Sequence, residues 1–270
     1  MNKQLNRRAI FDNLERGRGF SVLSIDSQEE MEVIWDAVIE SFGYCFNLKK
    51  PSKEKMKNIH KEKNLQNVFA TLSVFKRTLK KDAAFSILNL SWIKKLTDEL
   101  KMYPSDPYKL GYPCFTWRLV RPKTTSDYRN VHKDQWFRIA LKGTKHPNCI
   151  PGPKIIDKNL PSQLQTIKVW LALNVKPGFS GLMVSPESQK DDFPSFNLVK
   201  KDGLEKPLVN EKEVNKIKFE HVLTNSGDFV LFGEQLMHGG APTNTSDCRI
   251  SMEFELSSKN QKIYKNFQCN

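Results

Sequence analysis

The fold class is indicated most clearly by the stretch Ser226–Leu256, SGDFVLFGEQLMHGGAPTNTSDCRISMEFEL. A turn at Ser226 leads into the apolar run Phe229–Phe232, and a second run of alternating polar and apolar residues covers Arg249–Leu256. Both runs are short, rich in β-branched or aromatic residues, and bounded by Gly, Pro, Asn and Asp, which is typical of β-strands. The stretch therefore predicts two strands joined by a turn-rich loop.

Similar short runs recur through the second half of the chain, seven or eight of them over about 150 residues. They are CFTWRLV (114–120), IKVWLALNV (167–175), SGLMVS (180–185), FNLVKK (196–201), FEHVL (219–223), DFVLFG (228–233) and RISMEFEL (249–256). The pair Asp202-Gly203 lies between two runs and predicts a hairpin. Strands of this kind without helices between them indicate a sandwich or jelly roll.

The first hundred residues have a helical pattern instead. Ser27 with Glu30 three positions later is a capping-box signature, and apolar residues then recur at helical spacing as far as Phe42. Further apolar stripes over 65–79 and 88–100 predict two more helices.

These patterns together predict one domain over residues 1–270. We expect a mainly helical part at 1–102 and a jelly-roll core at 103–258, with a polar, lysine-rich, flap-like insertion at 187–218. The expected fold class is mainly β with flanking helices (α+β), a double-stranded β-helix (jelly roll, cupin-like) with the N-terminal helices packed on one sheet.

The composition excludes several classes of protein. A content of 39% hydrophobic and 10% aromatic residues indicates a globular chain, and no apolar run approaches the roughly 18 residues of a membrane span. The N-terminus has no apolar stretch of the secretory kind. Five scattered cysteines without a C-x-x-C pair predict free thiols and a cytoplasmic location.

The net charge of +13 is concentrated in one segment. Residues 49–81 contain eleven Lys or Arg and two acidic residues, which leaves +9 there. This segment is either a solvated helix surface, a rim that attracts an anionic small-molecule substrate, or a nucleic-acid footprint. The aromatic residues within it fit a core better than a stacking platform, which argues against nucleic acid.

Candidate metal ligands lie in the stretch NVHKDQWF, where His132 and Asp134 are separated by Lys133, which we expect to face outward. Two imidazoles and one carboxylate are a common ligand set for Fe(II), and residues two apart in a strand point the same way. Chance predicts 5 × 30/270, about 0.56, His-x-acid pairs, and the chain has two. The other, His60 with Glu62, lies in a helical pattern where such residues do not face each other.

The second imidazole has three remaining candidates. His146 precedes a proline in a loop, and His221 fits a solvent-facing strand position. His238 comes at the end of a very apolar strand, beside Gly239 and Gly240, which allow close approach of the backbone to a bound group. A core histidine with a satisfied hydrogen bond is the alternative for His238.

An arginine follows in the last strand. Arg249 and Ser251 share one face of an alternating strand, and a buried guanidinium needs a carboxylate, which it can hold with both nitrogens. A hydroxyl two residues on can donate to the same group. The alternative is an ordinary salt bridge to Glu253 or Glu255.

The order of these residues resembles that of the Fe(II)/2-oxoglutarate-dependent oxygenases, and in particular the phytanoyl-CoA hydroxylase-like family. His238 follows His132 by 106 positions, and Arg249 follows His238 by 11. The segments GFSVLS, HKDQWF, VWLALN and SGDFVLFGEQLMHGGAPTNTSDCRIS are similar to blocks of that family. Where the family often has Pro-Gly-Ser-His, this chain has Pro186-Glu-Ser-Gln189.

The resemblance implies a dioxygenase that hydroxylates a small-molecule substrate with release of succinate and CO₂. His132, Asp134 and His238 would hold Fe(II), with O₂ and 2-oxoglutarate as cosubstrates. Arg249 and Ser251 would bind the C5-carboxylate of 2-oxoglutarate. Trp170 is a candidate cavity wall that we assign with them to cosubstrate binding, with a structural role as its alternative.

Other residues near these motifs have weaker assignments. Trp136 is a further candidate cavity wall, with a structural role as its alternative. Arg118, Arg121 and Arg138 are candidates for holding an anionic substrate group, or are surface residues.

Alternative functions remain open at this stage. A nucleic-acid demethylase of the same class typically has a second arginine six positions after the first, and this chain has Glu255 there. A non-catalytic jelly-roll binding protein would not need all four residues. A zinc hydrolase could use two histidines and an aspartate but not Arg249. The sequence leaves the substrate and the oligomeric state open.

Overall fold

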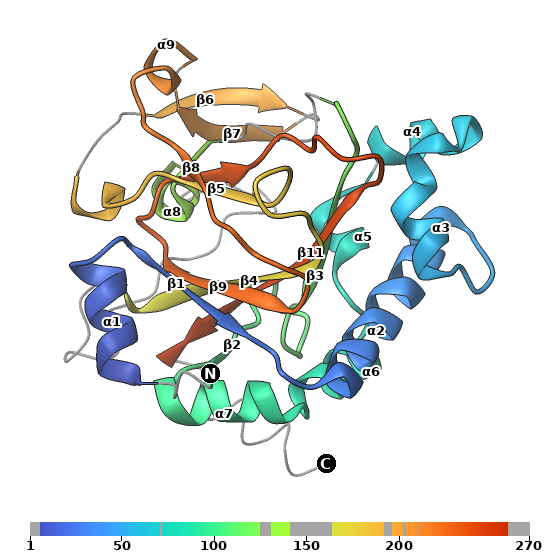
Figure 1. Ribbon diagram of the computed structural model, residues 1–270, viewed down its shortest axis with the longest axis horizontal. Coiled ribbons are helices and arrows are strands. Elements are labelled where there is room, and N and C mark those ends of the chain that lie inside the picture. The colour runs from blue at the N-terminus through green and yellow to red at the C-terminus, as the bar shows by residue number, and fades with distance from the viewer. Residues whose placement is uncertain are drawn as a thin grey trace.

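The computed structural model describes residues 6–70, 72–124, 131–140, 164–191, 196–201, 204–209 and 211–258 (Figure 1). The helices are α1 (Arg7–Glu15), α2 (Gln28–Phe46), α3 (Lys53–Asn58), α4 (Gln66–Ala70), α5 (Val74–Arg77), α6 (Lys81–Leu88), α7 (Ser91–Leu100), α8 (Asp134–Ala140) and α9 (Glu211–Val214), with short 3₁₀ turns η1 (Ile59–Lys61), η2 (Lys63–Leu65) and η5 (Ser188–Lys190). The strands are β1 (Phe20–Ser24), β2 (Tyr103–Pro104), β3 (Thr116–Val120), β4 (Thr166–Asn174), β5 (Leu182–Val184), β6 (Phe196–Lys201), β7 (Leu204–Val209), β8 (Glu220–His221), β9 (Asp228–Gly233), β10 (His238–Gly240) and β11 (Arg249–Ser257).

The described strands form three antiparallel sheets. Six strands make the main sheet in the order β1-β9-β4-β11-β2, with β3 also paired to β11; β10-β5-β8 and the hairpin β6-β7 make the other two. Each of the seven predicted runs contains one of these strands, so the prediction of a β-rich second half is confirmed. The hairpin is also confirmed, because Lys201 lies opposite Leu204.

The two faces of the main sheet pack against different layers. In β4, Val169 and Leu171 belong to the large apolar cluster that the helices share, whereas Trp170 and Ala172 belong to a smaller cluster with Leu182 and other residues of the second sheet. Successive strand residues point to opposite faces, so one run of sequence serves both clusters. The helices therefore cover one face of the main sheet, and its other face is turned towards the three-stranded sheet.

Helix α2 follows the predicted capping rule. Ser27 Oγ accepts a hydrogen bond from the backbone N–H of Glu30 at 3.1 Å, and the helix ends at Asn47, whose φ of 52° is left-handed. The helix predicted over 88–100 is confirmed as α7, but it begins only at Ser91, because Leu90 is extended. The helix predicted over 65–79 is wrong as a single element: the stripe is divided among η2, α4 and α5, and Ser73 caps a new helix at α5.

One strand in the N-terminal part was not predicted. The segment Phe20–Ser24 is β1, and it pairs with β9 along its whole length, with Phe20 opposite Phe232. This pairing places β1 at the edge of the main sheet.

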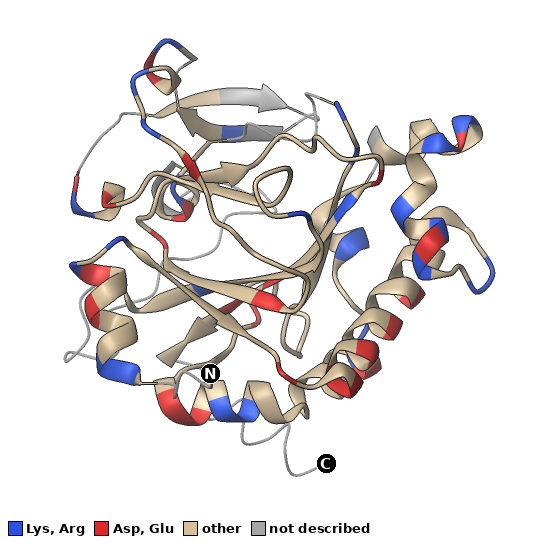
Figure 2. Cartoon of the chain, in the orientation of Figure 1, with Lys and Arg blue, Asp and Glu red and all other residues tan. Residues whose placement is uncertain are grey.

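The basic segment 49–81 forms the short helices α3 to α5 on one side of the molecule, beside acidic residues of α2 (Figure 2). Lys53 lies 2.5 Å from Glu32, and Lys57 lies 2.8 Å from Glu54. Ion pairs of this kind at the surface contribute little to stability. We interpret much of the positive charge of segment 49–81 as that of a solvated surface.

Two predictions about location can be compared with the structure in part. None of the helices in the described ranges combines the length and the apolar character needed to cross a bilayer. The three described cysteines, Cys45, Cys114 and Cys248, are free thiols. Cys149 and Cys269 lie outside the described residues.

Candidate metal centre

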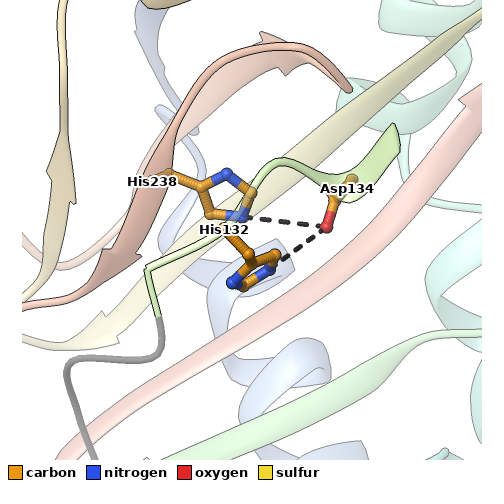
Figure 3. A group of neighbouring side chains, drawn as sticks. All are labelled: His132, Asp134 and His238. Carbon is orange, nitrogen blue, oxygen red and sulfur yellow. Dashed lines mark ion pairs between the residues drawn. The ribbon is translucent and has the colours of Figure 1, made fainter. Parts of the chain in front are cut away.

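Two side chains that are neighbours in sequence, His132 and Asp134, meet the distant His238 near the start of α8. His132, Asp134 and His238 each offer one ligand atom, and these atoms lie within 4.8 Å of one another (Figure 3). Asp134 Oδ1 is 3.4 Å from His132 Nε2 and 3.8 Å from His238 Nε2. No other cluster of three or more His, Cys, Asp or Glu of this kind occurs in the part of the chain that the structure describes.

The two histidines are joined through their main chains. The N–H of His132 donates to the carbonyl of His238 at 3.1 Å, and the N–H of His238 donates to the carbonyl of His132 at 3.0 Å. The imidazole positions are therefore fixed by backbone pairing rather than by the side chains alone.

The local structure differs from the predicted strand in two ways. His132 is an isolated bridge residue and Asp134 is the first residue of α8, so the pair does not lie on one strand. A carboxylate is favourable at the first turn of a helix. His238 was predicted at the end of the apolar strand, but β9 ends at Gly233 and His238 begins β10 in the second sheet.

His238 is a neutral imidazole whose tautomer is fixed. Its Nδ1 lies 2.9 Å from the carbonyl of Leu236, which can only accept, so Nδ1 carries the proton and Nε2 carries a lone pair. Burial lowers the pKa of His238 to about 4, and the Asp134 carboxylate offsets this only in part. The Nε2 lone pair and a carboxylate oxygen thus face each other across 3.8 Å without a proton to share.

Asp134 is held in its ionised form. Burial alone would raise the pKa of this carboxyl, but the ammonium of Lys168 and a hydrogen bond from His132 oppose burial, and the pKa stays well below the usual range. Lys168 Nζ lies 3.5 Å from Asp134 Oδ2 and 3.2 Å from Glu255 Oε1. Burial would lower the pKa of Lys168, but these two carboxylates raise it instead, so the lysine stays charged.

The predicted cosubstrate residues lie together on the face of the main sheet that is turned towards the three-stranded sheet. Arg249 Nη1 donates to Ser251 Oγ at 2.9 Å, and the guanidinium lies 5.7 Å from the centre of the Trp170 ring. All three residues are buried. The alternative reading of Arg249 as the salt-bridge partner of Glu253 or Glu255 is wrong, because these acids pair with Arg118 and Lys168.

The competing histidines lie elsewhere. His60 is on η1 with its Nδ1 3.2 Å from Cys248 Sγ, and Glu62 pairs with Lys55 rather than with His60. His221 is on β8, and His146 lies outside the described residues.

The other predicted wall and substrate residues are engaged in the fold. The ring of Trp136 lies 5.4 Å from that of Phe196 on β6, and Arg121 lies over the ring of Phe69 at 4.5 Å. Arg118 pairs with Glu253, and the side chain of Arg138 lies outside the described residues.

Two lysines of the site were missed by sequence reasoning. Lys133 was expected to point outward, but its side chain is buried, and Nζ donates to the carbonyls of Ser188 at 2.8 Å and Asp191 at 2.6 Å. The prediction was wrong because α8 begins at Asp134 and turns Lys133 inward. Lys168 had a visible signal, since it is the one charged residue in the run IKVWLALNV.

The start of the predicted flap is tied to both ligand segments. Ser188 Oγ accepts from the N–H of Met237 at 2.9 Å, and the N–H of Ser185 donates to the carbonyl of Met237 at 2.9 Å. Lys133, which is next to His132 in the chain, connects to the same segment through its hydrogen bonds to Ser188 and Asp191. Residues 186–189 read Pro-Glu-Ser-Gln rather than Pro-Gly-Ser-His, but they keep a serine, Ser188, which is hydrogen-bonded to Met237, next to His238.

A separate cavity of about 350 Å³ opens at the end of β4, between 174–176 and the loop residues 245–247. None of the three candidate ligands lines it, and neither does Lys168. We therefore assign it no part in the metal centre.

No protein-family model matches the chain, and no curated protein matches it in sequence. Solved structures similar to it include AviO1 from Streptomyces viridochromogenes Tue57, at 11% identity and a TM-score of 0.49 over 94% of this chain and 95% of that one. The non-heme alpha ketoglutarate dependent carbocyclase SnoK from nogalamycin biosynthesis has 11% identity and a TM-score of 0.47, over 94% and 85%. The epimerase SnoN, solved with Fe³⁺, alpha ketoglutarate and nogalamycin RO, has 11% identity and a TM-score of 0.46, over 93% and 82%. These likenesses are too weak to assign a function.

Proposed function

We propose that the protein is an Fe(II)- and 2-oxoglutarate-dependent dioxygenase of the double-stranded β-helix fold that hydroxylates a small organic molecule. One observation carries the proposal: His132, Asp134 and His238 each direct one ligand atom to a common point, and these atoms lie within 4.8 Å of one another. Two imidazoles and a carboxylate gathered in this way form a ligand set for a divalent metal ion.

The donor set favours iron among the common metals. Two imidazoles and one carboxylate form the facial ligand set of non-heme Fe(II) oxygenases, which leaves further positions open. A zinc hydrolase could use the same donors, but it gives no role to the buried arginine on β11. Asp134 also supplies the carboxylate that halogenases of this class lack, which argues for hydroxylation over halogenation.

Arg249 supports 2-oxoglutarate as the cosubstrate. Its guanidinium is buried on the face of the main sheet that carries Trp170, and it donates to the hydroxyl of Ser251. A planar guanidinium holds a carboxylate with two parallel hydrogen bonds. We propose that Arg249 and Ser251 bind the C5-carboxylate, with Trp170 as a wall beside them.

The residues of the chain would prepare the site for this chemistry. When bound, iron would let O₂ act as the oxidant: one oxygen atom would enter succinate as 2-oxoglutarate loses CO₂, and the other would enter the substrate as a hydroxyl group. Asp134 stays ionised and His238 stays neutral, so both are ready to bind a metal ion. The buried walls exclude water from the reacting group.

The basic segment does not support an anionic substrate. Met56 and Ile59 of its helices belong to the apolar cluster on the helix-covered face of the sheet. Lys168 and Trp170 are on the opposite face, since they alternate with Val169 of that cluster. We propose a small organic molecule as the substrate and assign it no charge.

Anaerobic titration of the iron-loaded protein with 2-oxoglutarate tests this function. We expect a visible charge-transfer band in the native protein. His132→Ala is expected to lose metal binding, and Arg249→Ala to retain the metal but bind 2-oxoglutarate at least about tenfold more weakly. Arg8→Ala, at a side chain that is 94% exposed, is the matched control. Unaltered iron affinity in His132→Ala would refute the metal assignment, and unaltered 2-oxoglutarate affinity in Arg249→Ala the cosubstrate assignment.

A further inference from the structure

The two oxygens of the Asp134 carboxylate have different neighbours. Oδ1 faces the Nε2 atoms of His132 and His238 at 3.4 and 3.8 Å, as the dashed lines of Figure 3 show. Oδ2 lies 3.5 Å from the ammonium of Lys168. One oxygen is thus directed to the other candidate ligands, and the second is directed to a cation of the protein itself.

Lys168 is held in this position by a second carboxylate. It lies on β4 directly opposite Glu255 of β11, and Nζ is 3.2 Å from Glu255 Oε1. Its side chain is only 16% exposed. The neighbouring acid on the same face, Glu253, is paired with Arg118. The ammonium is therefore fixed between two carboxylates.

We propose that Lys168 is a positioning residue that reserves Oδ2 of Asp134, so that this carboxylate offers a metal ion one oxygen rather than two. Carboxylates bind metal ions through either one or both oxygens. A second bond from Asp134 would fill a position that the facial ligand set leaves open for the cosubstrates. This inference rests on the proposed function, because it requires a metal ion at the three ligands.

The positive charge of Lys168 is also expected to affect the binding of the metal ion and of 2-oxoglutarate. An ammonium close to the centre repels a divalent cation and attracts an anionic cosubstrate. Removal of the ammonium is therefore expected to strengthen binding of the metal alone and to weaken binding of 2-oxoglutarate to the metal-loaded protein. A lysine that only supports the fold would, when replaced, weaken both.

The test is a titration of the metal-free protein with Co(II), followed by titration of the Co(II) protein with 2-oxoglutarate. Lys168→Met keeps most of the side-chain volume without the charge. We expect about tenfold tighter Co(II) binding and about tenfold weaker 2-oxoglutarate binding, at the low end of effects seen around metal ligands. The visible spectrum of Co(II) should also report an added ligand. Lys94→Met, at an exposed position on α7, is the matched control and should match the native protein.

Two further variants separate the charge from the fold. Lys168→Arg should keep the native affinities, because it keeps a cation beside Oδ2. Lys168→Met leaves Glu255 without this buried cation, which is destabilising; if that variant does not fold, the double variant Lys168→Met with Glu255→Gln removes both charges and should show the same opposite shifts.

The outcomes distinguish the inference from the proposed function. Parallel losses of both affinities in Lys168→Met, or no change in either, would overturn the positioning role while leaving the oxygenase proposal in place. Failure of the native protein to bind Co(II) would overturn the metal centre itself, and the inference with it.

Discussion

Replacement of Lys133 by methionine is a direct test of how the metal centre is connected to the segment that follows β5. The Lys133 side chain is 4% exposed, and its ammonium donates to the carbonyls of Ser188 and Asp191. Methionine has a similar volume but no donor. The change therefore removes two hydrogen bonds from a buried charge and leaves most of the packing intact.

The size of the effect follows from these two bonds. A hydrogen bond to a charged group contributes about 1.5–3 kcal/mol, so the pair contributes about 3 kcal/mol at the low end. Both bonds end in residues 188–191, so the loss should appear as local opening of that segment rather than as global unfolding. An opening free energy lower by about 3 kcal/mol corresponds to roughly 100-fold faster hydrogen exchange.

Hydrogen exchange read by mass spectrometry measures this directly. Peptides covering 185–191 should exchange roughly 100-fold faster in Lys133→Met, while peptides of β4 and β11 should be unchanged. Lys190→Met is the matched control: Lys190 lies in the same segment, and its 3.0 Å pair with Glu187 is exposed. Such a pair contributes at most about 0.5 kcal/mol, a factor of about two. Equal exchange in the two variants would refute the role of Lys133.

Acid should destabilise the metal-free protein in two stages, measurable by urea unfolding at a series of pH values. Burial lowers the pKa of His238 from 6.5 to about 4, so the unfolded chain binds the proton first and stability falls as the pH drops from about 6.5 towards 4. Burial alone would raise the pKa of Glu253, but Arg118 outweighs it and lowers the pKa from 4.5 to about 2; this stability is present above 4.5 and is lost as the pH falls towards 2. Glu253→Gln should reduce the lower stage, to which the ionised Asp134 also contributes, and leave the upper stage in place; an unchanged acid limb would contradict this. Trp117→Phe should cost about 1–2 kcal/mol in urea unfolding, because it removes the 2.9 Å bond from Nε1 to buried Ser41 Oγ, and native-like stability would contradict the importance of that bond.

Strand positions were predictable because alternation alone encodes which residues are buried on each face. In β4, every second residue from Ile167 belongs to the helix-side cluster, and this pattern is visible in the sequence. The helix breaks were not predictable from periodicity, since the apolar stripes continue through Ser73 and Leu90. There the local cap and backbone conformation decide. Phe20–Ser24 was missed because its strand character comes from pairing with β9, a partner about 200 positions away.

The sequence predicts which residues form the candidate metal centre, but not how these residues are arranged in space. The types and order of His132, Asp134 and His238 can be read from the chain, whereas their meeting depends on a main-chain pairing across the fold. The direction of Lys133 could not be read because it depends on where α8 begins. The ion pairs of Lys168 depend on the register between β4 and β11, and the sequence does not specify that register.

The reciprocal backbone bonds between His132 and His238 also concern how the protein reaches its native state. They close a loop of 238 − 132, or 106, positions. Closure of a loop of this length costs about 4 kcal/mol of chain entropy, and the sheet and core packing must supply that free energy before any ligand arrives. Under the proposed function, the three side chains can hold a metal ion only after this loop has closed. During refolding, the appearance of a Co(II) signal would mark the moment at which the two halves of the β region come together.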